Sequence, residues 1–290
     1  MKVLVSTDTS CLINYDVLNK YNISVFPLNV IIDGKEYLDG VTIKQDFLKD
    51  EMRANKVIKT STPPLGEVIE YFEKLFAEGY DRIIHFTISS KLSSMYSLFQ
   101  NVSTNFFEDK ITVIDSYSLT SLMLSHVLYA YEEVEKGTEI EKIVSEIEKR
   151  KQDNCIFFIP ENLTALKNGG RISPAIAAIG NTLGLKPVIA LKDGELVKES
   201  MTRHIKKTFR EKLDVIKVDY PLEKYDYTLI EFDADQKILE LVETHLKLTL
   251  DGENYIKGLI PINVCAHCGP GTIGFIVTPK INGKSLKEYI

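Results

Sequence analysis

Four serines stand within six residues, between a predicted strand and a predicted helix: Ser89, Ser90, Ser93 and Ser94. The strand is the apolar run 83–88, and the helix is indicated by apolar residues at helical spacing from Met95 to Phe106. In an open α/β sheet, ligands bind at such a junction, beside the unpaired N–H groups of the helix start. Hydroxyls and N–H groups together suit an anion. Capping and turn formation explain one of the serines, but do not fully explain four.

The same chemistry recurs at three further places in the chain. Clusters rich in Ser, Thr and Asp stand at residues 6–10, 60–64 and 115–118. Four such clusters favour a parallel sheet whose carboxyl edge forms a polar rim for a ligand. The alternative is ordinary capping of four helices, since capping residues are common wherever helices begin. In the cluster 60–64, Thr62 is expected to cap a helix whose first residue is Pro63.

A glycine pair precedes Arg171 in the second half of the chain. Gly169 and Gly170 follow a short predicted helix, 161–167, and are typical of a helix C-terminus. The sharp turn that two glycines permit is expected to push the Arg171 guanidinium outward. Such a side chain is either a solvated surface charge or part of a functional surface, and the sequence leaves both interpretations open.

Two cysteines and a histidine lie together near the end of the chain. Cys265 and Cys268 have the spacing of metal ligands, with His267 between them, but a structural zinc needs four ligands. The other two cysteines are distant and belong to no motif. A redox pair is also disfavoured, because the usual helix start after the first cysteine is missing. We therefore expect no metal, and we expect His267 to lie at the end of a strand over 256–264, beside a glycine loop.

Composition limits the classes of function that are open to the chain. It has 290 residues, 44% hydrophobic and 26% charged, which is enough for a substantial core. The net charge of −6, without a basic run, argues against nucleic acid as a partner. No apolar run approaches the ~20 residues that span a bilayer. Four cysteines without secretory features indicate reduced thiols and a cytoplasmic protein.

The order of predicted elements indicates two α/β domains. Strands and helices alternate up to an apolar strand at 155–159 that ends at Pro160. We place the domain boundary there, which gives an N-terminal domain over 1–158 and a C-terminal domain over 159–290. In the second domain, small residues at 175–183 predict a tight helix, and Asp193-Gly194 predicts a two-residue hairpin turn.

Five motifs occur in a fixed order: Thr60-Ser61-x-Pro63, Ser89-Ser90-x-Leu92-Ser93, Ile114-Asp115-Ser116, Gly169-Gly170-Arg171-Ile172-Ser173 and His267-x-Gly269-x-Gly271. With these motifs taken together, the chain resembles the DegV family, the bacterial fatty-acid-binding proteins that serve fatty acid kinase. Each motif is weak alone, but the ordered set is specific and covers almost the whole chain. The resemblance implies a two-domain DegV-like α/β fold, with a mostly parallel sheet in the N-terminal domain and the ligand site between the domains.

The resemblance also implies site residues. Thr60, Ser93 and His267 would hold the carboxylate of the acid. The same ligand-binding set is expected to include Ser61, Ser94, Cys268 and Gly269. Arg203 would lie near this site and support its hydrogen bonds, while Arg171 would lie near the surface that the kinase uses. No catalytic residue, no metal and no cofactor other than the bound fatty acid is expected.

The implied function is that of a carrier without chemistry of its own. It would bind a long-chain fatty acid in an interior tunnel and present the carboxylate to a separate ATP-dependent fatty acid kinase, giving acyl phosphate for phospholipid synthesis. Transient contact with a membrane or an acyltransferase is a further expectation. The residue types suit this function, since two hydroxyls and an imidazole can satisfy the oxygens of a carboxylate without a full buried countercharge.

Two other functions compete with the carrier. The first is a serine hydrolase that acts on acyl esters through Ser93 and His267, with Asp115 orienting the histidine. It is disfavoured because the chain has no Gly-x-Ser-x-Gly elbow. The second is a nucleotide-binding module, for which the chain lacks both Gly-x-Gly-x-x-Gly and Gly-x-x-x-x-Gly-Lys-Ser/Thr.

Overall fold

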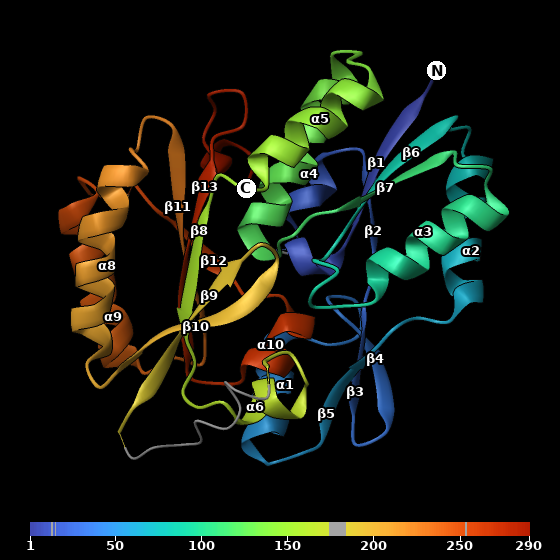
Figure 1. Ribbon diagram of the computed structural model, residues 1–290. Coiled ribbons are helices and arrows are strands. Elements are labelled where there is room, and N and C mark those ends of the chain that lie inside the picture. The colour runs from blue at the N-terminus through green and yellow to red at the C-terminus, as the bar shows by residue number, and fades with distance from the viewer. Residues whose placement is uncertain (13, 15, 174–183, 253) are drawn as a thin grey trace.

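The computed structural model describes residues 1–12, 14, 16–173, 184–252 and 254–290. The helix expected at 175–183 lies outside these residues. Within the described residues the strands form sheets of four, six and three strands. The four-stranded and six-stranded sheets stand side by side, with helices α4 (Thr120–Glu135) and α5 (Ile140–Arg150) between them (Figure 1).

The four-stranded sheet is parallel throughout, in the order β2-β1-β6-β7. Its strands are β1 (Val3–Asp8), β2 (Ile23–Phe26), β6 (Arg82–Thr87) and β7 (Ile111–Asp115). Successive side chains point to opposite faces, so Leu4 packs in one core with helices α2 (Leu65–Ala77) and α3 (Met95–Phe106), and Val5 packs in another with α4. The parallel sheet expected in the N-terminal half is therefore confirmed.

The six-stranded sheet has the order β10-β9-β8-β13-β11-β12, and only its β11–β12 pair is parallel. Its strands are β8 (Cys155–Ile159), β9 (Lys186–Lys192), β10 (Glu195–Thr202), β11 (Tyr225–Phe232), β12 (Ile256–Leu259) and β13 (Thr272–Pro279). The expected boundary after residue 158 falls inside β8, whose ladder partners β9 and β13 belong to the second half. We therefore propose that the boundary between the two halves lies ahead of Cys155.

The two faces of the six-stranded sheet have different surroundings. One face is covered by α8 (Ile205–Asp219) and α9 (Gln236–Thr249), with Phe157 and Phe275 buried in the core beneath them (Figure 1). The other face carries Ile156, Phe158 and Ile276, which line a cavity. Since side chains alternate along a strand, the neighbours Phe275 and Ile276 serve a packed core and a cavity respectively.

The hydroxyl cluster at residues 60–64 begins in a strand of a third sheet, the small antiparallel sheet β4-β3-β5. Its strands are β3 (Asn29–Ile32), β4 (Lys35–Leu38) and β5 (Ile58–Ser61). The expectation that residues 60–64 end a strand of the parallel sheet is therefore wrong. Thr62 is also not the N-cap of α2, because that position is taken by Pro64, without a side-chain hydrogen bond. A residue before proline avoids helical backbone angles, so Pro63 cannot easily begin the helix.

The strand expected over 256–264 is shorter than predicted. It ends at Leu259, and Pro261 is the N-cap of helix α10 (Ile262–Cys268). The buried residues Ile262, Cys265 and Ala266 follow the helical period, although their apolar character alone also suits a strand. His267 therefore lies on a helix, and the expectation that it ends a strand is wrong. Helix α10 packs against β3, β5, α1 (Gln45–Arg53) and α6 (Thr164–Asn168).

Helix α4 connects the two large sheets. Every residue from 120 to 130 is buried, which is typical of a helix enclosed on all sides. On one side α4 packs against β1, and on the other it packs against β13. The core of one half is therefore continuous with the core of the other through this helix.

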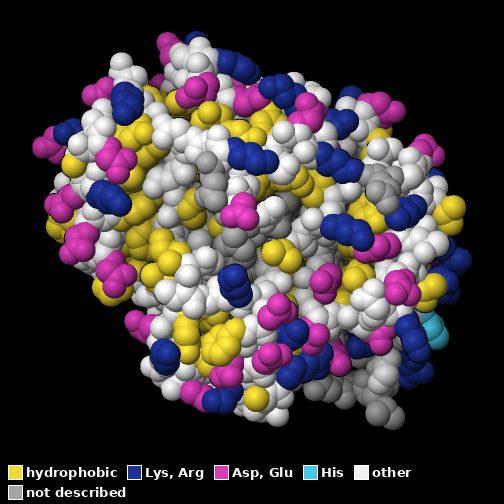
Figure 2. Space-filling model, turned by 180° about the vertical axis from the view of Figure 1, so that it is seen from behind, with side chains coloured by type: hydrophobic (Ala, Val, Ile, Leu, Met, Phe, Trp, Pro, Cys, Tyr) yellow, Lys and Arg dark blue, Asp and Glu magenta, His cyan; other side chains and the backbone are white. Residues whose placement is uncertain are grey.

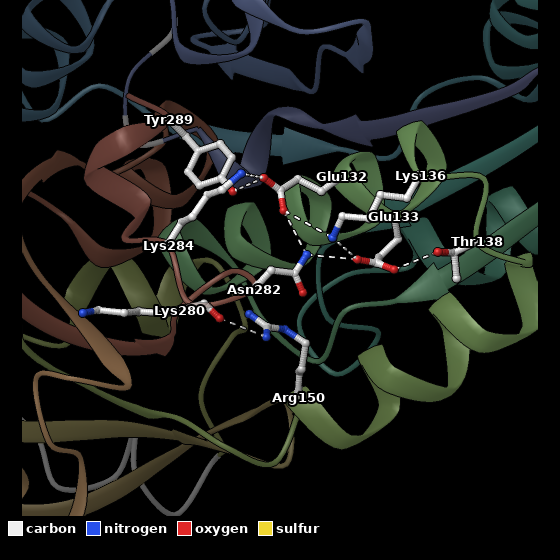
Figure 3. Close-up of polar contacts among 9 residues, drawn as sticks. All are labelled: Glu132, Glu133, Lys136, Thr138, Arg150, Lys280, Asn282, Lys284 and Tyr289. Atoms are coloured by element: carbon white, nitrogen blue, oxygen red, sulfur yellow. Dashed lines mark hydrogen bonds and ion pairs between the residues drawn. The ribbon is translucent and has the colours of Figure 1, made fainter.

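The C-terminal segment is held to α4 by a polar cluster around Glu132 (Figure 3). Glu132 accepts hydrogen bonds from Lys284 (2.6 Å), Tyr289 (2.5 Å) and Asn282 (2.9 Å). Partial burial opposes the charged form of Glu132, but these donors outweigh that effect and lower the pKa of the carboxyl to about 2. Nearby, the guanidinium of Arg150 donates to the carbonyl of Pro279 at 3.0 Å.

The surface carries charges of both signs. On the face shown in Figure 2, Lys and Arg side chains are interspersed with Asp and Glu, and smaller hydrophobic groups lie between them. Within the described part of the chain, no helix has the length and apolar character needed to cross a membrane.

Candidate functional site

A cavity of about 1060 Å³, counting the space at its open mouth, lies between the two halves of the molecule. The uncovered face of the six-stranded sheet contributes six side chains to the apolar wall of the cavity: Ile156, Phe158, Leu191, Leu196, Ile230 and Ile276. The N-terminal half contributes further apolar side chains, including Leu28, Ile88 and Met95. The polar lining includes Thr60, Ser93 and His267, three residues that the sequence singles out.

His267 and Thr60 form the centre of the polar lining. Their Nε2 and Oγ1 atoms share a hydrogen bond of 2.8 Å, which joins helix α10 to strand β5. Burial, and to a smaller extent the nearby Arg171 guanidinium, lower the pKa of His267 to about 4. The imidazole is therefore neutral at pH 7 and has one N–H to donate.

Only Ser93 of the four clustered serines lines the cavity. Its hydroxyl also accepts a hydrogen bond of 3.4 Å from the N–H of Met95, the first residue of α3, so it contacts both the helix start and the cavity. Ser94 does not line the cavity itself, but its hydroxyl shares a hydrogen bond of 2.7 Å with Thr62, which does. Ser89 donates to the carbonyl of Gly194 at 2.7 Å, in the turn between β9 and β10. Of the remaining predicted hydroxyls, Ser61 lines the cavity beside Thr60.

Arg171 is turned toward the cavity, contrary to the expectation that its guanidinium points outward. The side chain is half-buried and lines the cavity. It donates to the carbonyl of Leu92 at 3.1 Å and to the carbonyl of Gly169. These two carbonyls hold the guanidinium in place, and burial lowers the pKa of Arg171. It is the one Lys or Arg among the described residues that line the cavity.

Three other predicted site residues differ in their position relative to the cavity. Cys268 is buried and lines the cavity, while Gly269 ends α10 with a φ of +78° and does not line it. Arg203 is exposed in the segment before α8 and is not part of the lining. In the described part of the chain, no group of three or more His, Cys, Asp or Glu side chains is placed to hold a metal ion.

Two asparagines belong to the lining although the sequence analysis did not identify them. Asn29 and Asn263 are both 5% exposed, and the Oδ1 atom of each has no hydrogen-bond partner among the described residues. The amide nitrogen of Asn263 donates to Ser10 at 2.7 Å. Asn263 stands four residues before His267, so a helix would place both on one face. The spacing of four residues could have indicated Asn263 as a site residue, but only if the segment is known to be helical.

The arrangement required for a serine hydrolase is not formed by the described residues. No hydrogen bond joins Ser93 to His267, and the Nδ1 atom of His267 has no partner. Asp115 instead accepts hydrogen bonds from the backbone N–H groups of Ser90 (3.0 Å) and Tyr117 (3.2 Å). The three side chains therefore lack the contacts that activate a nucleophile.

Solved structures show the same architecture. A fatty acid binding DegV family protein from Streptococcus agalactiae is 26% identical, with a TM-score of 0.85 over 97% of this chain and 99% of that chain. A DegV family protein from Thermus thermophilus, described by its fatty acid binding, is 25% identical, with a TM-score of 0.85 over 96% and 100%. A stearic acid-binding protein from Eubacterium ventriosum is 27% identical, with a TM-score of 0.81 over 97% and 99%.

Sequence comparison gives the same result. A DegV domain-containing protein of Clostridium acetobutylicum is 28% identical over 283 residues, which is 96% of this chain and 99% of that protein. The family model described as "Uncharacterised protein, DegV family" matches residues 2–280. Since this match and the fold both extend over nearly the whole length, the chain belongs to the DegV family.

Proposed function

We propose that this protein binds a long-chain fatty acid in the cavity between its two halves. The observation that carries the proposal is the division of the lining into an apolar wall and a polar group that contains Thr60, Ser93 and His267. A fatty acid has the same division. The three similar structures named above are described as proteins that bind fatty acids, which supports the same ligand class here.

The acyl chain would lie along the uncovered face of the six-stranded sheet. Each CH₂ group removed from water contributes about 0.8 kcal/mol, so a long chain can supply most of the binding free energy. Part of this is offset by the lost freedom of the ligand and of the side chains around it. The wall offers only apolar contacts, so it gives affinity without fixing the direction of the ligand.

The carboxylate would be oriented by the polar group. Ser93 has a hydroxyl to donate, and Thr60 can donate its own when the single N–H of neutral His267 lies on Nε2 and is directed to Thr60 Oγ1. Arg171 adds a positive charge to the same lining, which favours an anion. The sequence-based expectation of a site without a full countercharge is thus modified, because a guanidinium lies close enough to affect the pKa of His267.

We further propose that the protein is a carrier and that a separate kinase performs the chemistry. A carboxylate oxygen would attack the terminal phosphorus of ATP on the kinase, giving acyl phosphate and ADP. Neutral hydrogen-bond donors suit this step, because they hold the carboxylate without neutralising its charge, and the Arg171 guanidinium is held by the carbonyls of Leu92 and Gly169. Arg171, which is half-buried in the cavity lining, would lie near the surface that meets the kinase, and the product would enter phospholipid synthesis.

Mass spectrometry of the purified protein under native conditions tests the proposal. We expect one bound fatty acid per chain, and we expect delipidated protein to bind palmitate or oleate. The variant Leu196→Trp, which fills part of the cavity, should lose this binding. Leu248→Trp is the matched control, because Leu248 is 76% exposed on α9. A folded wild-type protein that carries no lipid and binds neither acid would contradict the proposal.

A further inference from the structure

The first glycine of the pair before Arg171 has no backbone reason to be glycine. Gly169 follows helix α6 with φ −75° and ψ −13°, which are ordinary helical angles for any L-residue. The neighbouring Gly170, by contrast, has a φ of +67° and adopts the left-handed conformation that favours glycine. The two glycines therefore have different physical causes, although they are adjacent in the sequence.

What excludes a side chain at Gly169 is the imidazole of His267. A Cβ atom built on Gly169 would lie 2.9 Å from Cε1 of that ring and closer still to Nδ1. The third nearest atom is the carbonyl oxygen of Ala165 at 3.2 Å, a closer approach than most Cβ contacts but longer than those to the imidazole. Residues 169 and 267 are 98 positions apart, and they meet because α6 packs against α10.

The ring of His267 is held on only one edge by a hydrogen bond. Nε2 bonds to Thr60 at 2.8 Å, whereas buried Nδ1 has no partner among the described residues. The Nδ1 edge is therefore positioned by packing against the bare backbone of Gly169. The carbonyl of Gly169 also accepts a hydrogen bond from Arg171. The backbone at Gly169 therefore contacts two side chains of the lining, those of His267 and Arg171.

We propose that Gly169 is a positioning residue that seats the imidazole of His267 against Thr60. The absence of a side chain at residue 169 lets the ring enter the space between α6 and β5. Any side chain there would push the ring away from Thr60. The consequence for ligand binding rests on the function proposed above, but the seating of the ring does not, and the two are tested separately.

A double-mutant cycle tests the seating directly. Gly169→Ala is expected to lower the folding equilibrium constant by about tenfold in the wild-type background. In a His267→Ala background, the same substitution should change it by less than about twofold, because the ring that it collides with is gone. An equal loss in both backgrounds would overturn the proposal. Gly66→Ala is the matched control, since no atom lies within 4 Å of a Cβ built there.

Imidazole titration by NMR gives a readout that a purely structural role would not move. The pKa of His267, about 4 in the wild type, should rise toward its ordinary value of 6.5 in Gly169→Ala, because the ring leaves its buried position. His85, whose pKa is lowered to about 3 by burial elsewhere, should not change. An unchanged pKa for His267 in the folded variant would contradict the proposal.

The consequence for the ligand is measured with ¹³C-carboxyl palmitate. In Gly169→Ala we expect retention of the acid to fall by less than about threefold, since the chain supplies most of the affinity. The carboxyl resonance should shift toward the value found in His267→Ala. A wild-type resonance in Gly169→Ala would contradict the positioning role. If the wild type binds no fatty acid, the proposed function fails, whereas the double-mutant cycle still decides whether Gly169 seats the ring.

Discussion

The two faces of the six-stranded sheet differ in what covers them. On one face, α8 and α9 cover Phe157, Phe275 and their neighbours. The protein's own side chains form the core on this face. On the other face, Ile156, Phe158 and Ile276 line a cavity. Both faces have the same alternation and similar residue types. Hydrophobic pattern therefore shows which side chains avoid water, and it does not show whether protein or ligand covers them.

The largest expected difference is between truncations on the two faces. Phe275→Ala should destabilise the protein by about 3–5 kcal/mol, because Phe275 is fully buried against Phe157 and Tyr227. Phe158→Ala in ligand-free protein should cost less than half as much, since Phe158 already borders empty space. Chemical denaturation of both variants measures the difference. Equal losses in the ligand-free protein would mean that the cavity face is as well packed as the helix-covered face.

The next prediction distinguishes the role of the polar lining from that of the apolar wall. His267→Ala removes the ring that orients the Thr60 hydroxyl toward the charged carboxylate, a hydrogen bond worth about 1.5–3 kcal/mol, so kinase-coupled phosphorylation should fall roughly 10- to 100-fold. Retention of the fatty acid should fall much less, because the wall is intact. Phosphorylation assays and native mass spectrometry measure the two quantities on the same sample. Parallel losses would show that the histidine also determines affinity.

A third prediction concerns the polar cluster around Glu132, whose described residues do not line the cavity. Glu132→Gln should destabilise the protein by about 1 kcal/mol at pH 7, by weakening its bonds to Lys284 and Tyr289. The folded-state pKa of Glu132, about 2, is below the ordinary 4.5. Its contribution is thus complete above pH 4.5 and is lost as the pH falls toward 2. The difference in stability between wild type and variant should shrink over that range, while fatty acid binding at pH 7 stays unchanged.

The smallest effect is expected at the exposed hydrogen bond between Thr62 and Ser94. Thr62→Ala should change stability by less than about 0.5 kcal/mol, because water can replace the lost partner. If the bond has a role at the cavity, the dissociation rate of the acid will change instead. Stopped-flow displacement of a fluorescent fatty acid measures that rate, with Ser94→Ala as the reciprocal variant.

The parts of the fold that depend on local pattern could be predicted from the sequence. The strand before the serine cluster, the helix α3 and the hairpin turn at Asp193-Gly194 follow from periodicity and turn residues, and all three are present. Helix α10 was predicted as part of a strand, because the apolar positions in a stretch of only seven residues fit both the helical period and the strand period. Thr60 was assigned to the wrong sheet because a short strand carries no information about its partners.

The site shows the same limit. The resemblance to the family implied Thr60, Ser93 and His267, and the fold brings all three to one cavity. The direction of Arg171 was predicted wrongly, because it depends on the carbonyl of Leu92, in a distant part of the chain, together with the nearby carbonyl of Gly169. The contact between Gly169 and His267 was not predictable, since nothing local connects a glycine with a ring 98 residues later.

Helix α4 has a consequence for attempts to divide the molecule. Its residues 120–130 are buried by elements from both halves, so a fragment that ends near residue 158 would expose the surface that β13 normally covers. Such a half-molecule should aggregate when expressed alone and should recover only when the complementary fragment is supplied in the same cell. Engineering that exchanges halves between relatives must therefore match the contacts of this one helix first.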